Sequence, residues 1–305
     1  MKSDRMIPNI LNRFTRRNNV IIILILALFS VGICWYYASC IEPQKLILKQ
    51  QKIDLHQWGD AWQDFRILLI ADIHARKEND AGRLENIIRM AESTSPDLIL
   101  LLGDYGAGYC ADQSMLPGDI AGFLSRLKAR HGVYAILGNH DWVHNPLLFR
   151  QALENAGITV LENESRIISC GTRGDLELCG LPDYGTREHL YHKKLIMQKT
   201  DRNIPALAMT HNPLPFYKAM EQLPYDLTVS GHTHGGQISL PLWGPVKLMW
   251  EYRFYRLLKG LKRSKDGRQI YVTSGLGNSI FNMRMGNVPE MVLLTVNTRS
   301  GSQSN

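Results

Sequence analysis

The sequence predicts an α/β fold with a largely parallel sheet, placed behind one N-terminal helix. Three observations lead to this prediction. Short continuous apolar runs, typical of strands buried on both faces, alternate with segments of helical periodicity. This alternation indicates crossover connections between parallel strands. An uncharged apolar run precedes the alternating pattern, and polar clusters follow nearly every strand.

The apolar run over residues 20–38 predicts a transmembrane anchor, preceded by a basic segment over residues 1–19. Its length matches the ~20 residues that a helix needs to cross a bilayer. Trp35 and Tyr36 lie at one end, where aromatic side chains favour the membrane interface, and arginines dominate the other end. We therefore expect a single-pass protein of a bacterial-type inner membrane. The positive-inside tendency favours a catalytic part on the outer side.

Two kinds of processing are alternatives to a permanent anchor. Thr15-Arg16-Arg17 resembles a twin-arginine export signal, and Ala38-Ser39-Cys40 resembles a lipoprotein cleavage site. We expect an uncleaved anchor, because the apolar run is long for a signal peptide. Lysines that follow the run weigh against the outward orientation, so the side of the membrane stays open.

The formal net charge of +7 does not by itself indicate a nucleic-acid-binding protein. The excess positive charge lies before the apolar run and over residues 247–268, and the charges between these clusters nearly balance. No separate groove of interleaved basic and aromatic residues supports a nuclease. Five cysteines form neither a disulfide framework nor a Cys-x-x-Cys metal site. Cys170 and Cys179 flank a predicted hairpin and either pair or remain separate thiols.

The first elements after the anchor establish the alternation. Residues 39–60 predict an extended connector, because no clear helical or strand period is present. The catalytic domain is expected over residues 61–298. Continuous apolar runs predict strands, one of them after the breaker Pro96, and apolar side chains at helical spacing predict the helices between them. The strands are expected over residues 66–70, 97–102 and 133–137, and the helices over residues 81–93, 120–129 and 146–156.

Shorter strands and more frequent loops follow the third helix. These strands are expected over residues 158–161, 166–169, 176–179, 206–210, 227–230, 270–274 and 291–296. Residues 299–305 predict a polar, disordered tail. Residues 245–262 predict a basic amphipathic helix with its apolar side chains on one face. This helix either rests on the membrane surface, as such helices often do, or packs as an ordinary core-facing helix.

Potential metal ligands follow the strands, at the sheet edge where open α/β folds bind ligands. Residues two apart point the same way in extended chain, so Asp72 with His74 and His232 with His234 can each converge on one centre. Mixed carboxylate, imidazole and amide ligands suit manganese, iron or zinc. Seven ligands exceed the need of one ion, whereas two divalent ions ~3.5–4 Å apart would use them with a shared carboxylate. The seven residues are Asp72, His74, Asp104, Asn139, His211, His232 and His234.

Taken together, these clusters resemble the calcineurin-like metallophosphoesterase superfamily over the chain that follows the anchor. The resemblance implies the metallo-dependent phosphatase fold, a four-layer αββα sandwich of mixed, largely parallel sheets. It implies that Asp72, His74 and His234 bind one ion. Asn139, His211 and His232 would bind the other, and Asp104 would bridge the two. The matching blocks are Asp72-Ile73-His74, Gly103-Asp104, Gly138-Asn139-His140-Asp141, His211 and Gly231-His232-Thr233-His234.

The same resemblance implies catalytic roles next to the ligands. His140 would stabilise or protonate the leaving oxygen, and Asp141 would either hold His140 in orientation or only begin a helix. Residues 231–240, followed by Pro241, resemble a membrane-anchored branch of the superfamily. That branch includes YaeI- and YkuE-type phosphodiesterases and the UDP-2,3-diacylglucosamine hydrolases of lipid A synthesis.

The expected function is a membrane-anchored, dinuclear-metal-dependent phosphoesterase that uses metal-activated hydroxide. It would hydrolyse a phosphodiester or pyrophosphate bond of a lipid-linked substrate, for which UDP-2,3-diacylglucosamine is the most specific candidate. That nucleotide sugar is cytoplasmic, which conflicts with an outward-facing domain. The alternatives are a general phosphodiesterase or phosphatase that faces outward, and a non-catalytic binding module of the same fold.

Overall fold

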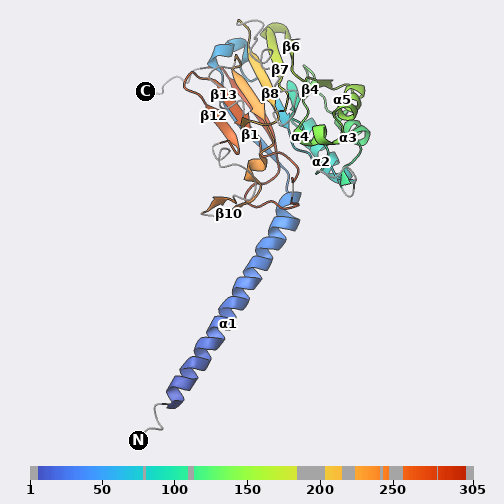
Figure 1. The fold of residues 1–305 in the computed structure, drawn as a ribbon. Helices are drawn as coiled ribbons and strands as arrows, with labels where there is room; N and C mark the ends of the chain where they lie inside the picture. Colours follow the sequence, from blue (N-terminus) through green and yellow to red (C-terminus); the bar gives the residue numbers. More distant parts are fainter. Residues whose placement is uncertain are drawn as a thin grey trace, which may run out of the picture.

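The structure is a computed structural model, and it places two six-stranded sheets in a head from which one long helix projects (Figure 1). It describes residues 6–77, 80–108, 113–183, 203–214, 224–240, 243–246, 257–279 and 281–299. Side chains are described from residue 18 onward. The N-terminal end of the helix is remote from the head.

The first sheet has the strand order β1-β14-β2-β3-β4-β5. Strand β14 pairs antiparallel with β2, and the other neighbours pair parallel. The sheet is therefore mixed but largely parallel, as expected from the sequence. Its strands are β1 (Ile47–Asp54), β2 (Arg66–Ile70), β3 (Leu98–Leu101), β4 (Val133–Ala135), β5 (Thr159–Val160) and β14 (Glu290–Asn297).

The second sheet has the order β12-β13-β9-β8-β7-β6. The outer pairs β12/β13 and β6/β7 are antiparallel, and the three inner pairings are parallel. Its strands are β6 (Glu164–Ser169), β7 (Asp175–Gly180), β8 (Ala206–Thr210), β9 (Leu227–Ser230), β12 (Gly260–Arg263) and β13 (Gln269–Val272). A separate two-stranded ribbon is formed by β10 (Ser239–Leu240) and β11 (Gly244–Pro245).

Alternation along the strands builds two hydrophobic layers. Leu69 and Leu100 face the second sheet and pack with Leu178 and Val229 from it. The neighbouring residues of the same strands point to the opposite face, where they pack against helices. Each fully buried Leu contributes about 1.5–3 kcal/mol relative to exposure. The α/β fold of stacked, mixed sheets with helices is thus confirmed. The α-helices are α1 (Met6–Tyr36), α2 (Ala81–Glu92), α3 (Pro117–Leu124), α4 (Asn139–His144) and α5 (Pro146–Asn155).

Short helical turns complete the description. A π-helix over Tyr37–Ile41 and a 3-10 turn over Glu42–Gln44 continue from α1 into the head. Further 3-10 turns span His56–Trp58, Asp60–Trp62, Gly171–Arg173 and His234–Gly236. The helix expected over residues 120–129 begins earlier, because Pro117 is well suited to a first helical position, and it ends at Leu124.

Two sequence-based expectations differ from the structure. Residues 39–60 are not simply a connector, because β1 adds to the first sheet and pairs parallel with β14 along eight residues. An amphipathic helix over residues 245–262 is wrong at both ends. Pro245 belongs to β11, and Gly260–Arg263 forms strand β12 against β13. Cross-strand hydrogen bonding to the edge of β13 takes precedence over helical periodicity there. Residues 247–256 lie outside the described part.

The two hairpin cysteines are free thiols in the structure. The register of β6 and β7 places Ser165 opposite Cys179, whereas Cys170 follows the last paired residue of β6. The Cys179 thiol instead accepts a hydrogen bond from Tyr225 Oη at 3.1 Å. Burial raises the pKa of Cys170 to about 11, so this thiol is unreactive near neutral pH.

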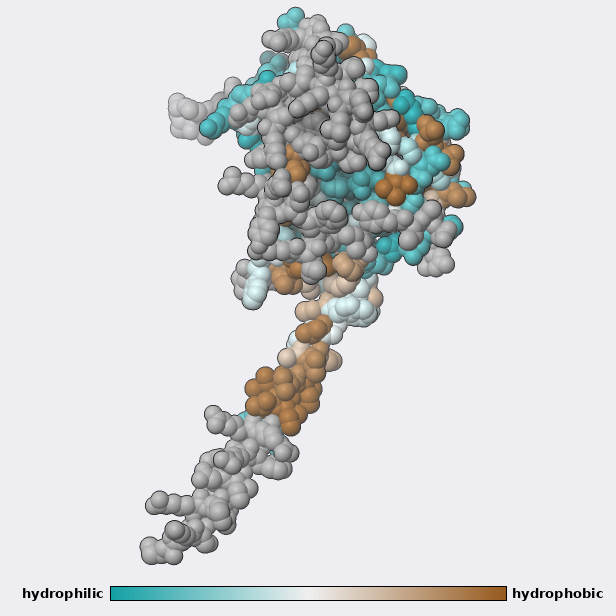
Figure 2. Space-filling view, viewed as in Figure 1, coloured by the Kyte–Doolittle hydropathy of each residue, from teal (hydrophilic) through white to brown (hydrophobic). Residues whose placement is uncertain are grey.

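The described part of helix α1, from residue 18 onward, presents exposed apolar side chains (Figure 2). Residues 18–44 form one helical stretch that is long and apolar enough to cross a membrane by length and composition. The large apolar residues from Val20 to Tyr36 are exposed, which is costly for a helix in water.

The end of this helical stretch is fastened to the head by two hydrogen bonds. Arg284 N donates to Ala38 O at 2.8 Å, and Asn287 N donates to the buried carboxylate oxygen Glu42 Oε1 at 2.8 Å. The helical stretch is therefore joined to the loop between β13 and β14.

We expect Glu42→Ala to destabilise this junction. The substitution leaves the buried Asn287 N–H without its acceptor, which costs about 1–3 kcal/mol. Thermal unfolding in detergent should show a lower Tm for Glu42→Ala. Glu42→Gln is the matched control, because it keeps an acceptor oxygen and should unfold close to the wild-type temperature. An equal loss in both variants would show that the charge, not the acceptor, matters.

Candidate metal centre

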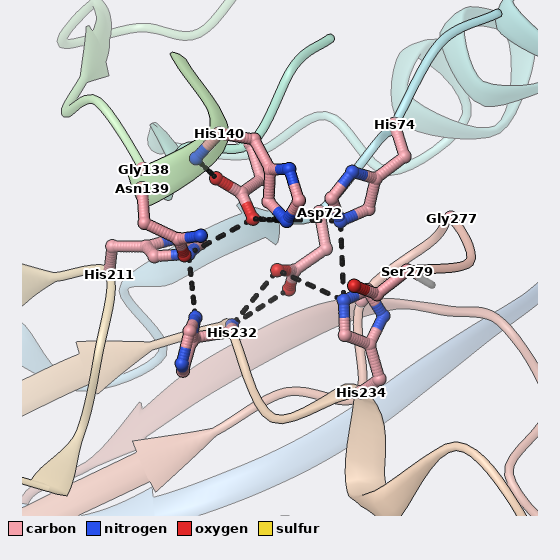
Figure 3. Close-up of polar contacts among 12 residues, drawn as sticks. Asp72, His74, Gly138, Asn139, His140, His211, His232, His234, Gly277 and Ser279 are labelled. Atoms are coloured by element: carbon pink, nitrogen blue, oxygen red, sulfur yellow. Dashed lines mark hydrogen bonds and ion pairs between the residues drawn. The ribbon is translucent and has the colours of Figure 1, made fainter. Parts of the chain in front are cut away.

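The expected ligands come from the ends of five strands, and those that Figure 3 labels point toward one another. In the first sheet they follow β2, β3 and β4. In the second sheet they follow β8 and β9. Parallel strands end at a common edge, so the topology itself brings these segments together. The structure thus places all seven expected ligand residues, and His140, around one centre.

One group contains Asp72, His74 and His234, whose ligand atoms lie within 4.8 Å of one another. His74 Nε2 lies 3.2 Å from His234 Nε2, and His234 Nε2 lies 3.8 Å from Asp72 Oδ1. All three side chains are buried. This arrangement offers one carboxylate and two imidazoles to a single position.

A second group contains Asp104, His211 and His232. His211 Nε2 lies 3.1 Å from His232 Nδ1 and 3.1 Å from Asn139 Oδ1. Asn139 and His232 are only partly buried, so this side of the centre is the more open one.

Asp104 lies between the two groups. Its Oδ2 is 3.5 Å from His74 Nε2 in the first group and 3.2 Å from His211 Nε2 in the second. Its other oxygen, Oδ1, accepts a hydrogen bond from His140 N at 2.9 Å. One carboxylate oxygen is therefore shared by both groups, which is the geometry that a bridging ligand requires.

The tautomers of the histidines fit a divalent cation. The Nδ1 atoms of His74 and His211 lie 3.2 Å and 2.7 Å from the carbonyl oxygens of Gly106 and Leu102. A carbonyl accepts only, so each Nδ1 carries the proton and each Nε2 can direct its lone pair at the centre. Against the effect of burial, Asp104 raises the pKa of His211 well above its ordinary value, so without a metal a proton lies between His211 Nε2 and Asp104 Oδ2, and a divalent cation would take its place.

The electrostatics point the same way. Burial lowers the pKa of His74 and of His232 to about 3, although Asp104 opposes the shift, so both rings are neutral near pH 7. Burial, together with the charge of Asp104, raises the pKa of Asp72 to about 7. Neutral imidazoles beside crowded carboxylates form a donor set that a divalent cation would stabilise.

The ligand-bearing turns are strained in a consistent way. Asp72, His74, Asp104, His232 and His234 all have φ between 46° and 71°, a region that side chains other than Gly seldom adopt. The turns also pack tightly. A Cβ at Gly275 would lie 2.5 Å from Asp72 Oδ2, so only glycine fits this approach.

His140 lies at the rim of the first group and beside the shared carboxylate. Its ring packs edge-on against His74 at a centroid distance of 4.8 Å, and its Nε2 lies 3.9 Å from Asp104 Oδ2. Its Nδ1 is 3.0 Å from Gly108 O, which places the Nδ1 proton toward that carbonyl. The Nε2 edge is therefore directed toward the centre.

The hydrogen bonds described for Asp141 are to backbone N–H groups of neighbouring turns. Its carboxylate is fully buried and accepts from Asp104 N at 2.7 Å, Gly138 N at 2.9 Å and Tyr105 N at 2.9 Å. The bond to Gly138 N satisfies the backbone N–H of the N-cap residue at the start of α4. Of the two roles expected for Asp141, the structure supports the helix-start role and adds a second one, which is to join the turns after β3 and β4.

Sequence reasoning missed Arg284, which braces the loop behind the centre. This fully buried guanidinium donates to Ser274 O and Asn287 O at 2.9 Å each and to Asn278 Oδ1 at 3.1 Å. Nη2 also lies 3.3 Å from His234 Nδ1. A lone arginine in a loop carries no pattern that could have marked it.

Comparisons with known proteins agree with this geometry. The family model described as "Calcineurin-like phosphoesterase" matches residues 65–236. The chain is 33% identical to "Phosphodiesterase YaeI" of Escherichia coli over 233 residues, covering 75% of this chain and 81% of that protein. It is 27% identical to "Uncharacterized metallophosphoesterase YkuE" of Bacillus subtilis, covering 85% and 88%. It is 24% identical to "UDP-2,3-diacylglucosamine pyrophosphatase LpxG" of Chlamydia trachomatis, covering 80% and 87%.

Proposed function

Because the chain belongs to the calcineurin-like phosphoesterase family, we propose that it is a membrane-anchored hydrolase of a phosphodiester or pyrophosphate bond that works with two divalent cations. The single observation that carries the proposal is the Asp104 carboxylate shared by two groups of ligands. Asp72, His74 and His234 would hold one cation. Asn139, His211 and His232 would hold the other. Manganese, iron and zinc all suit this donor set.

Divalent cations held there supply Lewis-acid stabilisation of charge and lower the pKa of water, so that hydroxide is available near neutral pH. The chain's own residues position the reaction. Asp104 keeps its negative charge between the two ligand groups, because His211, against the effect of burial, holds its pKa well below the usual range. The partly exposed Asn139 and His232 lie on the open side, where a phosphate would enter.

His140 is the proposed catalytic residue for the leaving group. Gly108 O accepts the proton on Nδ1, so a second proton on Nε2 would be directed toward the centre. Such a proton can be donated to the leaving oxygen as its bond to phosphorus breaks. No buried Ser or Cys nucleophile is needed, since water can attack phosphorus directly.

The exposed apolar helix supports a substrate at the membrane. An anchored phosphoesterase meets lipid headgroups in its own leaflet, and we propose a lipid-linked ester as substrate. The pyrophosphatase among the relatives acts on a lipid nucleotide sugar according to its name, which makes UDP-2,3-diacylglucosamine the first lipid to test. A general phosphodiesterase or phosphatase that faces outward is the second candidate, favoured by the arginines before the apolar run. A non-catalytic binding module is disfavoured, since every ligand position is filled.

We expect the full-length protein, purified in detergent and stripped with EDTA, to hydrolyse none of three probes until Mn²⁺ is restored. The probes are bis(p-nitrophenyl) phosphate, p-nitrophenyl phosphate and UDP-2,3-diacylglucosamine. His140→Asn should lower kcat by about 10²–10⁴-fold, the usual contribution of a positioned proton donor. His56→Asn, at an exposed histidine remote from the centre, is the control. Turnover that survives EDTA, or an equal loss of kcat in His140→Asn and His56→Asn, would contradict the proposal. A preference for the lipid would favour a cytoplasmic catalytic domain.

A further inference from the structure

A polar cavity of about 570 Å³ opens next to the metal centre. His74 lines it, so the cavity adjoins the first group of ligands directly. Its other lining residues are almost all polar or charged. They are Pro43, Gln44, Arg76, Lys77, Asp80, Arg83, Gln113, Asn278 and Asn282. A cavity with this lining does not suit acyl chains, which need apolar walls.

The cavity carries an excess of positive charge. Among its described lining residues, Arg76, Lys77 and Arg83 are cationic, and Asp80 is the one carboxylate. That carboxylate already accepts a hydrogen bond from Arg76 N at 2.6 Å. The lining therefore holds more cations than its carboxylate can balance, and an anion is the ligand that would compensate them.

Arg83 shows this imbalance most clearly. Its Nη2 is buried, and among the described residues no acceptor lies within hydrogen-bonding distance of it. Burial lowers the pKa of Arg83, with Asp80 acting in the opposite sense. An unpartnered buried donor normally costs stability, so its retention at a cavity wall points to a ligand that satisfies it.

The cavity also lies where the membrane helix enters the head. Pro43 and Gln44, at the end of the helical stretch that continues α1, form part of its wall. Figure 1 shows this entry point on the side of the head from which α1 projects. A headgroup in the same leaflet would therefore reach His74 by way of this cavity.

We propose that Arg76, Lys77 and Arg83 form a subsite for a second anionic group of a membrane-borne substrate, beside the phosphoester that is cleaved. The inference rests on the proposed hydrolase activity and narrows it. The preferred substrate is an amphiphile whose headgroup carries two anionic groups, such as two phosphates in series. Amphiphiles with a single phosphodiester leave the subsite empty and are poorer substrates.

Turnover tests the subsite in the intact protein. Full-length chain in phosphatidylcholine vesicles with Mn²⁺ is assayed on CDP-diacylglycerol, which has two phosphates, and on bis(p-nitrophenyl) phosphate, which has one. Arg83→Met and Lys77→Met should each lower kcat/KM for the lipid by about tenfold or more, because each removes a charged hydrogen-bond donor. Their turnover of the small diester should stay at the wild-type value. Arg89→Met, at an exposed arginine of the same helix α2, should change neither.

Binding tests the subsite without catalysis. Calorimetry on the EDTA-stripped protein should detect inorganic phosphate, with binding lost in Arg83→Met and kept in Arg89→Met and Asp104→Asn. Equal loss of both substrates in Arg83→Met would overturn the proposal, since it would mark a general structural role. Phosphate binding with unchanged lipid turnover would also overturn it, because the cavity would then take free phosphate only. If no substrate is turned over, the hydrolase proposal fails. The calorimetry still tests the subsite in that case: loss of phosphate binding in Arg83→Met supports an anion site at these basic side chains, and unchanged binding contradicts it.

Discussion

Asp104→Asn should abolish metal-dependent turnover while leaving the fold intact. The substitution removes the charge that both ligand groups share but keeps an oxygen to accept from His140 N. Loss of several kcal/mol of Lewis-acid stabilisation corresponds to a fall in kcat of at least about 10³-fold. The number of Mn²⁺ bound per chain, measured by mass spectrometry after desalting, should fall in parallel.

The same variant makes a second, less obvious prediction about stability. Asp72, Asp104 and Asp141 are buried, and the charge of Asp104 raises the cost of ionising the other two, whereas His211, against the effect of burial, holds the pKa of Asp104 itself well below its usual range. Removing this charge relieves that repulsion but leaves His211, whose Nε2 lies 3.2 Å from Asp104 Oδ2, without its buried partner, so the Tm of the EDTA-stripped protein should fall. Binding of Mn²⁺ should stabilise the wild type more than the variant, since stabilisation follows affinity.

Asp97→Asn is the matched control, because Asp97 lies just before β3, at the opposite end of that strand from Asp104. Its Oδ2 accepts from Arg66 N at 2.9 Å, which an asparagine oxygen can also do. We expect wild-type turnover and metal content in Asp97→Asn. A similar fall in both variants would mean that loss of activity reports a general defect of the sheet and not loss of the bridging carboxylate.

The arrangement of the site could be predicted because it depends on short-range order. Each ligand follows a recognisable apolar strand, and parallel strands must end at a common edge. The prediction of strand β2 was therefore enough to place Asp72 and His74, and the prediction of strand β9 was enough to place His232 and His234. The α/β class follows from the same alternation. What the pattern could not supply is the pairing between distant segments, such as β1 with β14.

The roles of two arginines and the strand β12 could not be predicted, because they depend on contacts between segments far apart in the sequence. Arg83 and Arg284 are single basic residues in the sequence, and only the folded chain shows that one lines a cavity and the other is enclosed by carbonyls. Leu261 likewise continues the helical spacing of Leu257 and Leu258, yet Gly260–Arg263 pairs with the edge of β13. Periodicity reports which faces are apolar, but a free sheet edge nearby can still override it.

Asp141→Ala should have the largest effect on stability, and Asp141→Asn a smaller one. The alanine leaves three buried backbone N–H groups without their acceptor, at a cost of about 1–3 kcal/mol for each. A total near 3 kcal/mol or more corresponds to a Tm lower by about 6–12 °C for a domain of this size. Asparagine keeps one oxygen but turns its NH₂ toward the remaining N–H groups, so it retains only part of the network.

This prediction separates the two roles that the sequence left open for Asp141. Orientation of His140 would require Asp141→Asn to slow turnover without a change in Tm, as we expect for His140→Asn. The structure instead predicts that Asp141 variants lose stability first, because their carboxylate joins Asp104 N and Tyr105 N to Gly138 N. Turnover then falls as a consequence, since the turn that carries Asp104 and the turn that carries Asn139 and His140 are no longer held together. Two measurements distinguish these roles: the Tm of the EDTA-stripped protein, and kcat at a temperature well below the Tm of wild type and variant. A lower Tm indicates the structural role, and a lower kcat with an unchanged Tm indicates orientation of His140.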